Sequence, residues 1–281
     1  MRRRATEHAT GSEEGPGNPT DRAAVQRGGV PAASAAVVFG SGLAVEPDGL
    51  AVEREIPYTR LGWPVGGVAG HGSRLLVAGA TGRSGGAARG SGTAPGVILL
   101  AFGRSHFYEG WSRTELERPV RDLAAAGVRR LVVTCATGSL AGDLRPGDVV
   151  AAHTVVDLQA APDEEAPRLP VCAADAAARL AAALAPDLAA RAGAYVAVAG
   201  PQYETPAEAA WLAGFGDVVG MSAVHEVRAA LDAGVDVRLL AVVTNRSGAG
   251  LDHDEVLAAG AGAAAGLRRV LCRVLGDERL W

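Results

Sequence analysis

The chain has 281 residues and a formal net charge of −4, and all 27 of its basic residues are arginine. Because it has no lysine, a P-loop nucleotide site and Schiff-base catalysis such as that of pyridoxal-phosphate enzymes are excluded. Its 48% hydrophobic and 21% charged residues are typical of a globular protein.

The composition also restricts partners and compartment. The charge is near neutral without a broad basic patch, so we expect no nucleic-acid partner. The sequence contains no run of about 18 apolar residues, so we expect no membrane span. The three cysteines, Cys135, Cys172 and Cys272, lie far apart without a CxxC spacing. We therefore expect no disulfide framework and no metal site, and we expect a reducing, cytoplasmic location.

Two polar stretches differ in composition from the rest of the chain. Residues 1–33 begin with MRRR but lack the apolar core of an export signal, so they predict a disordered tail. Residues 79–96 are rich in Gly and Ser and predict a flexible loop between two strands that pair with each other. A domain is expected over residues 34–281.

Within that domain, short apolar runs alternate with helical patterns. The runs predict strands over residues 35–39, 73–80, 96–102, 129–136, 147–156, 194–200 and 236–244. The periodic segments predict helices over residues 113–128, 171–192, 206–215, 224–234 and 253–275. Such alternation predicts a single α/β domain with a central mixed, partly parallel β-sheet flanked by helices.

Ligands of such sheets collect at the carboxyl ends of the strands. Ser41 lies between two glycines after the first strand, where backbone N–H groups and a hydroxyl can hold an anion. Arg104, His106, Tyr108 and Glu109 lie within six residues after the third strand, and an arginine fork suits phosphate. A surface turn with an Arg–Glu pair is the alternative for this group, and a structural hydrogen bond is the alternative for His71.

Candidates for binding a planar heterocycle lie further along the chain. Small residues beginning at Ala136 permit close ligand approach, and Tyr203 beside Glu204 can stack on a ring and accept its N–H bonds. A helix start at Pro206 is the alternative there. Four further candidates are Met221, Ser222, Asn245 and His253. Asn245 carries both a donor and an acceptor, whereas His253 could simply cap the last helix.

Together these segments resemble the trimeric class of purine nucleoside phosphorylases, which includes the methylthioadenosine phosphorylases. The resemblance rests on motifs in the same order, over about residues 35–270: GSGL, IPYTRLGWPVGGVAGH, GRSHFYEGW, VVTCATGSL, VAGPQYET, VGMSAVHEV, VVTN and HDEVLAAG. It implies reversible phosphorolysis of purine nucleosides to free base and ribose 1-phosphate by a homotrimer. Inorganic phosphate is then the co-substrate, and no metal or organic cofactor is required.

The resemblance also implies a role for each candidate. The phosphate would be held by Ser41, Arg104, His106 and Ser222 and the backbone of Ala136, with His71 nearby. The sugar would contact Tyr108, Met221 and His253. The base would stack on Tyr203 and bind Glu204 and Asn245 at its polar edge. His106, Glu204 and Asn245 are the expected catalytic residues.

The carboxylate of Glu204 requires a donor such as N1–H, which favours 6-oxopurines such as those of inosine and guanosine over adenine. The chain departs from the family at Cys135 and Ser139, and at His225, where Pro is usual. Residues 158–171 lack the aromatic side chain that family trimers lend to the neighbouring subunit's sugar site. Two alternatives therefore stay open: a methylthioadenosine or modified-nucleoside phosphorylase, and a non-catalytic homologue that binds nucleoside or phosphate.

Overall fold

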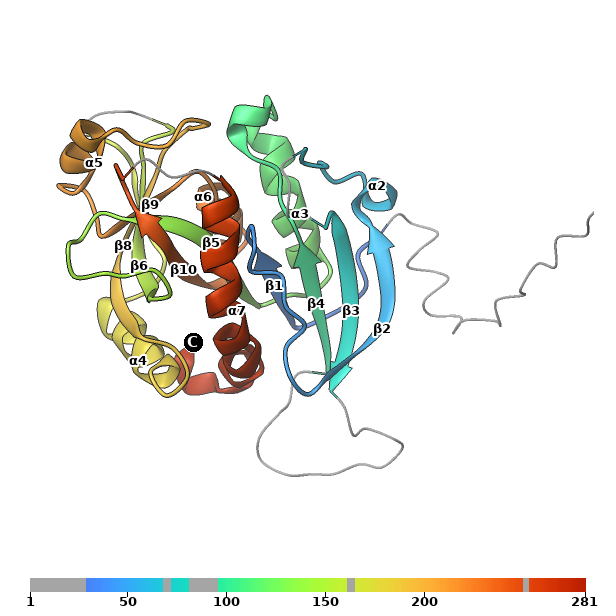
Figure 1. Cartoon of the computed structure of the whole chain (residues 1–281). Helices are drawn as coiled ribbons and strands as arrows, with labels where there is room; N and C mark the ends of the chain where they lie inside the picture. The colour runs from blue at the N-terminus through green and yellow to red at the C-terminus, as the bar shows by residue number, and fades with distance from the viewer. Residues whose placement is uncertain (1–28, 68–71, 81–95, 161–164, 250–252) are drawn as a thin grey trace, which may run out of the picture.

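The computed structural model describes residues 29–67, 72–80, 96–160, 165–249 and 253–281, without the side chains of Ala80 and residues 253–259. Within these residues one mixed sheet of ten strands runs through the whole molecule (Figure 1). The mixed α/β architecture expected from the sequence is confirmed.

One half of the sheet is open. It consists of β2 (Leu50–Pro57), β3 (Arg74–Ala80), β4 (Val97–Phe102) and β1 (Ala35–Phe39), which lie in this order. β2, β3 and β4 form antiparallel pairs, whereas β1 runs parallel to β4. The predicted pairing of β3 with β4 across the Gly-rich segment is confirmed, although residues 81–95 lie outside the described part of the chain.

In the other half, the strands close into a ring. The strands are β5 (Arg130–Ser139), β9 (Val218–Gly220), β8 (Ala190–Ala197), β6 (Val149–Asp157) and β10 (Asp236–Arg246). Each pairs with the next, and β10 pairs again with β5. A short strand, β7 (Arg168–Pro170), extends the edge at β6. Within the ring, β5 and β10 run parallel, so their carboxyl ends at Ser139 and Arg246 lie side by side.

Helices cover both faces of the sheet. They are α2 (Tyr58–Leu61), α3 (Arg113–Ala125), α4 (Ala174–Leu184), α5 (Pro206–Leu212), α6 (Val224–Asp232) and α7 (His253–Gly276). Alternate residues of β1 face opposite layers: Val38 packs with α3 and α6, whereas Val37 packs with α4 and α7. This alternation follows from the two-residue period of a strand.

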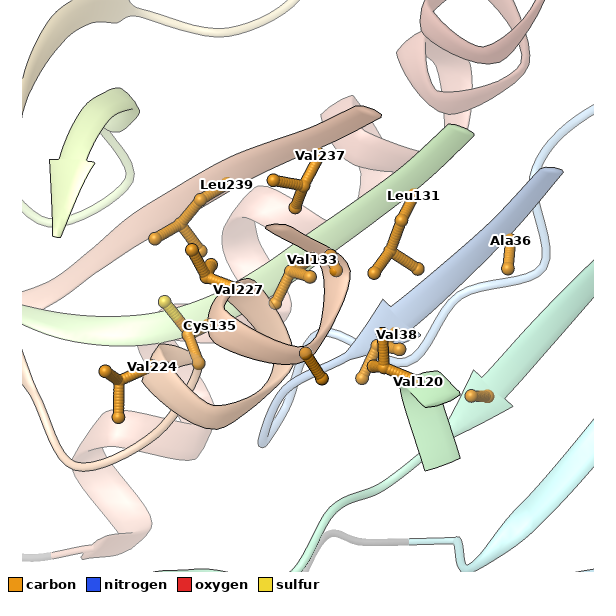
Figure 2. Packing of buried hydrophobic residues seen from close by; sticks show 14 of the residues in the cluster. Ala36, Val38, Val120, Leu131, Val133, Cys135, Val224, Val227, Val237 and Leu239 are labelled. Atoms are coloured by element: carbon orange, nitrogen blue, oxygen red, sulfur yellow. The ribbon is translucent and has the colours of Figure 1, made fainter. Parts of the chain in front are cut away.

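Cys135 belongs to the layer beneath α6. Figure 2 shows its side chain on β5 between Val133 of the same strand and Val224 and Val227 of the helix. Burial raises the pKa of this thiol to about 12. Cys135 is therefore a neutral packing residue and not a nucleophile.

The predicted helix over residues 171–192 is wrong in extent. α4 ends at Leu184, Pro186 follows two residues later, and residues from Ala190 onward form β8. The strands β2, β7 and β9 were not predicted.

The chain is already packed before residue 34. Val30 and Ala33 pack against the core, and the Ala33 N–H donates to the Ala126 carbonyl (3.3 Å). The rest of the predicted tail, residues 1–28, lies outside the described part of the chain. Among the described helices, none is both long enough and apolar enough to cross a membrane.

Candidate active site

Nine of the twelve predicted site residues line one cleft at the carboxyl ends of the strands. They are Ser41, His106, Tyr108, Ala136, Tyr203, Glu204, Met221, Ser222 and Asn245. The cleft encloses about 630 Å³ of empty space, counting its open mouth. Arg104 lies behind Ser222, while His71 and the His253 side chain lie outside the described residues.

The turn after β1 brings Ser41 into the cleft. Gly40 is required there, because a Cβ atom would come within 2.9 Å of both the Cys135 Cα and the Thr134 carbonyl oxygen. The Gly40 N–H donates to Thr134 Oγ1 on the neighbouring strand (3.2 Å). This close approach of two backbones fixes the Ser41 turn against β5.

Arg104 is buried and paired, so the surface-turn alternative is wrong for it. Its Nε lies 2.8 Å from Glu226 Oε1 on α6, and its Nη1 donates to Ser222 Oγ (3.1 Å). The two charged side chains are only 4% and 10% exposed. A buried charge needs such a partner, and Glu226 was not among the predicted residues.

His106 is held by the carboxylate of Glu109. Glu109 Oε1 accepts from the His106 backbone N–H (2.6 Å) and lies 3.0 Å from its Nδ1, while Oε2 accepts from the Gly67 N–H (2.7 Å). Burial, together with the nearby Arg104 charge, lowers the pKa of His106 below its ordinary value despite Glu109. The imidazole is thus neutral near pH 7. Because a carboxylate only accepts, Nδ1 carries the proton and Nε2 is an acceptor.

Ser222 is fixed by Tyr195 and by the start of α6. The Tyr195 hydroxyl donates to the Ser222 carbonyl (2.7 Å) and lies 3.2 Å from its backbone nitrogen. The next residue, Ala223, has a φ of +65°, which is uncommon for a residue with a side chain. Strain of this kind clusters at functional sites, and here it turns the chain from Ser222 into α6.

Tyr203 and Glu204 also line the cleft. They lie between β8 and α5. Thr205 caps the start of α5: its side chain accepts from the Glu208 backbone N–H, and the Glu208 side chain accepts from the Thr205 backbone N–H. The helix-start alternative therefore holds for residues 205–208, while Tyr203 and Glu204 face the cleft. Tyr203 is 40% exposed. Glu204 Oε2 accepts from Ser247 Oγ (2.7 Å).

A bulge at the end of β10 turns Asn245 into the cleft. The register with β5 shifts between Val243 and Asn245, so Thr244 is the additional residue. Thr244 Oγ1 lies 3.0 Å from Asn245 Oδ1. Since this contact occupies Oδ1, the Nδ2 group is the donor that Asn245 can offer a ligand.

Tyr108 and Met221 add apolar surface to the cleft. The Tyr108 ring stacks on His106 with centroids 4.9 Å apart and planes 10° from parallel. The stacked Tyr108 ring therefore gives the cleft an apolar surface beside His106.

The departures from the family motifs lie beside the cleft. His225 is buried, and its Nε2 lies 3.0 Å from the side-chain oxygen of Gln159. Arg228 pairs with Asp157 in the same region. In the described part of residues 158–171, the chain forms β7 against β6.

In the described ranges we find no group of three or more Asp, Glu, Cys or His side chains that could hold a metal ion. The chemistry available in the cleft comes from the side chains themselves: a buried arginine, a neutral histidine, hydroxyls, an amide and a carboxylate.

Residues 79–276 match the family model described as the phosphorylase superfamily. The chain belongs to this superfamily. Among curated relatives, purine nucleoside phosphorylase 1 of Geobacillus stearothermophilus is 34% identical, covering 79% of this chain and 82% of its own. Purine nucleoside phosphorylase of Mycobacterium leprae is 35% identical, covering 89% and 91%. These relatives place the phosphorylase chain in the purine nucleoside phosphorylase family, which confirms the family and the enzyme class expected from the sequence.

Solved structures of purine nucleoside phosphorylase from Schistosoma share the phosphorylase fold. The complex with hypoxanthine has a TM-score of 0.71 at 28% identity, covering 92% of this chain and 95% of that one. The Schistosoma mansoni complex with adenosine has a TM-score of 0.69 at 26% identity, with 92% and 96% covered.

Proposed function

We propose that this phosphorylase cleaves purine nucleosides reversibly with inorganic phosphate, giving free base and ribose 1-phosphate, and that it prefers 6-oxopurines such as those of inosine and guanosine. The observation that carries the proposal is that anion donors and heterocycle-binding groups come together at one cleft. The anion donors, here called the phosphate wall, are Ser41, His106 and Ser222 with Arg104 behind Ser222, and the heterocycle-binding groups, here called the base wall, are Tyr203, Glu204 and Asn245. No metal or cofactor takes part in this scheme.

The phosphate wall supplies fixed positive charge and donors. Ser41 and Ser222 offer hydroxyls, and Arg104 lies directly behind Ser222. His106 Nε2 accepts the remaining O–H of the phosphate dianion or a sugar hydroxyl. The dianion beneath the sugar then stabilises the positive charge that develops on C1′ as the glycosidic bond breaks.

The base wall stabilises the leaving group. As the bond from C1′ to N9 breaks, the electron pair moves into the purine, and N7 becomes more basic. Asn245 Nδ2 donates a hydrogen bond to N7, and Glu204 accepts from N1–H. The bond to N7 strengthens as negative charge accumulates on the purine, so Asn245 favours the transition state over the bound nucleoside. Glu204 recognises and orients the base through N1–H.

A substrate panel tests the proposal. Inosine, guanosine and methylthioadenosine are offered with and without phosphate, and base release is followed. We expect release only with phosphate and at least about 10-fold higher kcat/KM for the 6-oxopurines, since a site built for a donor rejects analogues lacking it. No phosphate-dependent release from any of the three contradicts the proposal and favours a non-catalytic binding protein.

A second candidate is a phosphorylase for methylthioadenosine or a modified nucleoside. The described part of residues 158–171 has no aromatic side chain, and one Schistosoma mansoni relative binds adenosine. Competition between inosine and methylthioadenosine at equal concentration separates the two candidates, because a preference for the adenine compound contradicts the role given to Glu204.

The family resemblance further supports a homotrimer, and the scattered cysteines support a reducing, cytoplasmic location. The reaction would serve purine salvage or a specialised nucleoside pathway. Sedimentation analysis of the whole chain tests the trimer, and a monomer at assay concentrations contradicts it.

A further inference from the structure

Ser247 contacts the base wall from outside the cleft. Its Oγ donates to Glu204 Oε2 over 2.7 Å. Ser247 is absent from the lining of the cleft and instead lines a neighbouring groove between α5 and the end of β10. Since Glu204 lines the cleft while Ser247 does not, Ser247 can influence a ligand through Glu204 without touching the ligand itself.

Two strands fix the position of Ser247. The residue follows β10 directly, and its N–H donates to the Ser139 carbonyl at the end of β5 (3.0 Å). It is only 8% exposed. Gly138 leaves the room that the Ser247 side chain needs, because a Cβ atom there would lie 3.2 Å from Ser247 Cβ.

Glu204 has far less support of its own. It lies in the segment between β8 and α5, and in the described part of the chain Ser247 is the single hydrogen-bond partner of its carboxylate. A glutamate side chain with three rotatable bonds loses conformational freedom when it binds a ligand. A donor that already holds one oxygen removes part of that cost.

We propose that Ser247 is a positioning residue that holds Glu204 Oε2 so that the other carboxylate oxygen faces the purine, and that Ser247 thereby strengthens recognition of N1–H. The inference rests on the proposed function for the identity of the base. Its physical basis is a charge-assisted hydrogen bond from a buried, backbone-anchored hydroxyl.

A double-mutant cycle tests it. The wild type, Ser247→Ala, Glu204→Ala and the double variant are compared by kcat/KM for inosine and by calorimetric Kd for hypoxanthine. We expect Ser247→Ala to lower kcat/KM about 10-fold, equivalent to about 1.4 kcal/mol, chiefly by raising KM. In the Glu204→Ala background the same change has an effect below about twofold, because the residue through which Ser247 acts is gone.

Ser139→Ala is the matched control. It removes a buried hydroxyl from the same groove, while the Ser139 carbonyl that anchors Ser247 stays in place. We expect its kcat/KM and Kd to stay within about twofold of the wild type.

The outcomes separate the two claims. Equal losses from Ser247→Ala in both backgrounds, or no loss in either, overturn the positioning role. Hypoxanthine binding that depends on Ser247 without phosphate-dependent turnover supports the positioning role and overturns the proposed function. A wild type that neither turns over inosine nor binds hypoxanthine overturns both.

Discussion

The two walls of the cleft are built in different ways. On the phosphate wall, Arg104 forms a buried pair with Glu226 of a separate element, α6, and His106 is held by Glu109 of its own turn. On the base wall, Tyr203 is 40% exposed and Glu204 relies on Ser247. Fixed charge stabilises a transition state best when it is desolvated and needs no rearrangement. A planar base instead needs an open face through which it can enter and leave.

The largest expected effect comes from breaking the phosphate wall. Arg104→Met removes the cation behind Ser222 and leaves Glu226 without its partner. We expect kcat/KM for inosine to fall about 100- to 1,000-fold, as for loss of a preorganised donor. The free energy of unfolding should fall by about 3–5 kcal/mol, since a buried carboxylate loses its counter-charge. Steady-state kinetics and denaturant unfolding measure the two effects.

The double variant Arg104→Met with Glu226→Gln separates folding from function. It removes the unpaired charge, so most of the unfolding free energy should return while activity stays low. Recovery of activity in this variant would show that Arg104 acts only as a structural partner of Glu226.

The next largest effect is expected at Asn245 of the base wall, which acts while the glycosidic bond breaks. Asn245→Ala removes the Nδ2 donor but leaves the buried ion pair intact. We expect kcat to fall about 100-fold with KM changed less than about threefold, because the bond to N7 strengthens in the transition state. A raised KM with unchanged kcat would instead mean that Asn245 binds substrate and transition state equally.

A smaller effect is expected at the exposed ring. Tyr203→Ala removes the stacking surface, which is worth about 1–3 kcal/mol for a base on an aromatic ring, so KM for inosine should rise at least about fivefold. Tyr203→Phe keeps the ring and should stay within about twofold. Because Tyr203 is partly exposed, the free energy of unfolding of both variants should change by less than about 0.5 kcal/mol.

The smallest effect concerns protonation on the phosphate wall. The pKa of His106 lies below its ordinary value of 6.5 because of burial and Arg104, and Glu109 opposes that shift. As pH falls below 6.5 the unfolded chain takes up this proton first, so the contribution of His106 to stability is lost as pH falls toward the folded pKa. Titration followed by NMR should show a still lower pKa in Glu109→Gln. A higher pKa in that variant would contradict the assigned contact.

Much of the fold follows from local pattern. The buried apolar run over residues 35–39 predicts β1 at the bounds observed. The end of the helix predicted over the Ala-rich segment 171–192 is wrong, because the helical pattern of the sequence continues after α4 has ended at Leu184. Pro186 is the stop signal that limits this helix. β2 was missed because its residues are largely exposed, and β9 because three residues carry almost no periodicity.

Site residues can be predicted from the sequence only where several polar or aromatic side chains directly follow a predicted strand. Arg104 and Asn245 belong to such motifs. Their partners Glu226, Thr244 and Ser247 look like ordinary helix or strand-end residues in the sequence, and the fold alone brings Ser247 to Glu204 across 43 positions. Residues that support a functional group are missed because their role lies in a tertiary contact.

The most direct test of the account follows the phosphate itself. Inosine and inorganic phosphate are incubated with the whole protein, and ribose 1-phosphate is followed by phosphorus NMR while hypoxanthine is quantified. We predict that the two products form in equal amounts, and that Asn245→Ala slows both equally. Hypoxanthine released without consumption of phosphate would show a hydrolase, and no conversion of inosine or guanosine would contradict the proposed phosphorolysis.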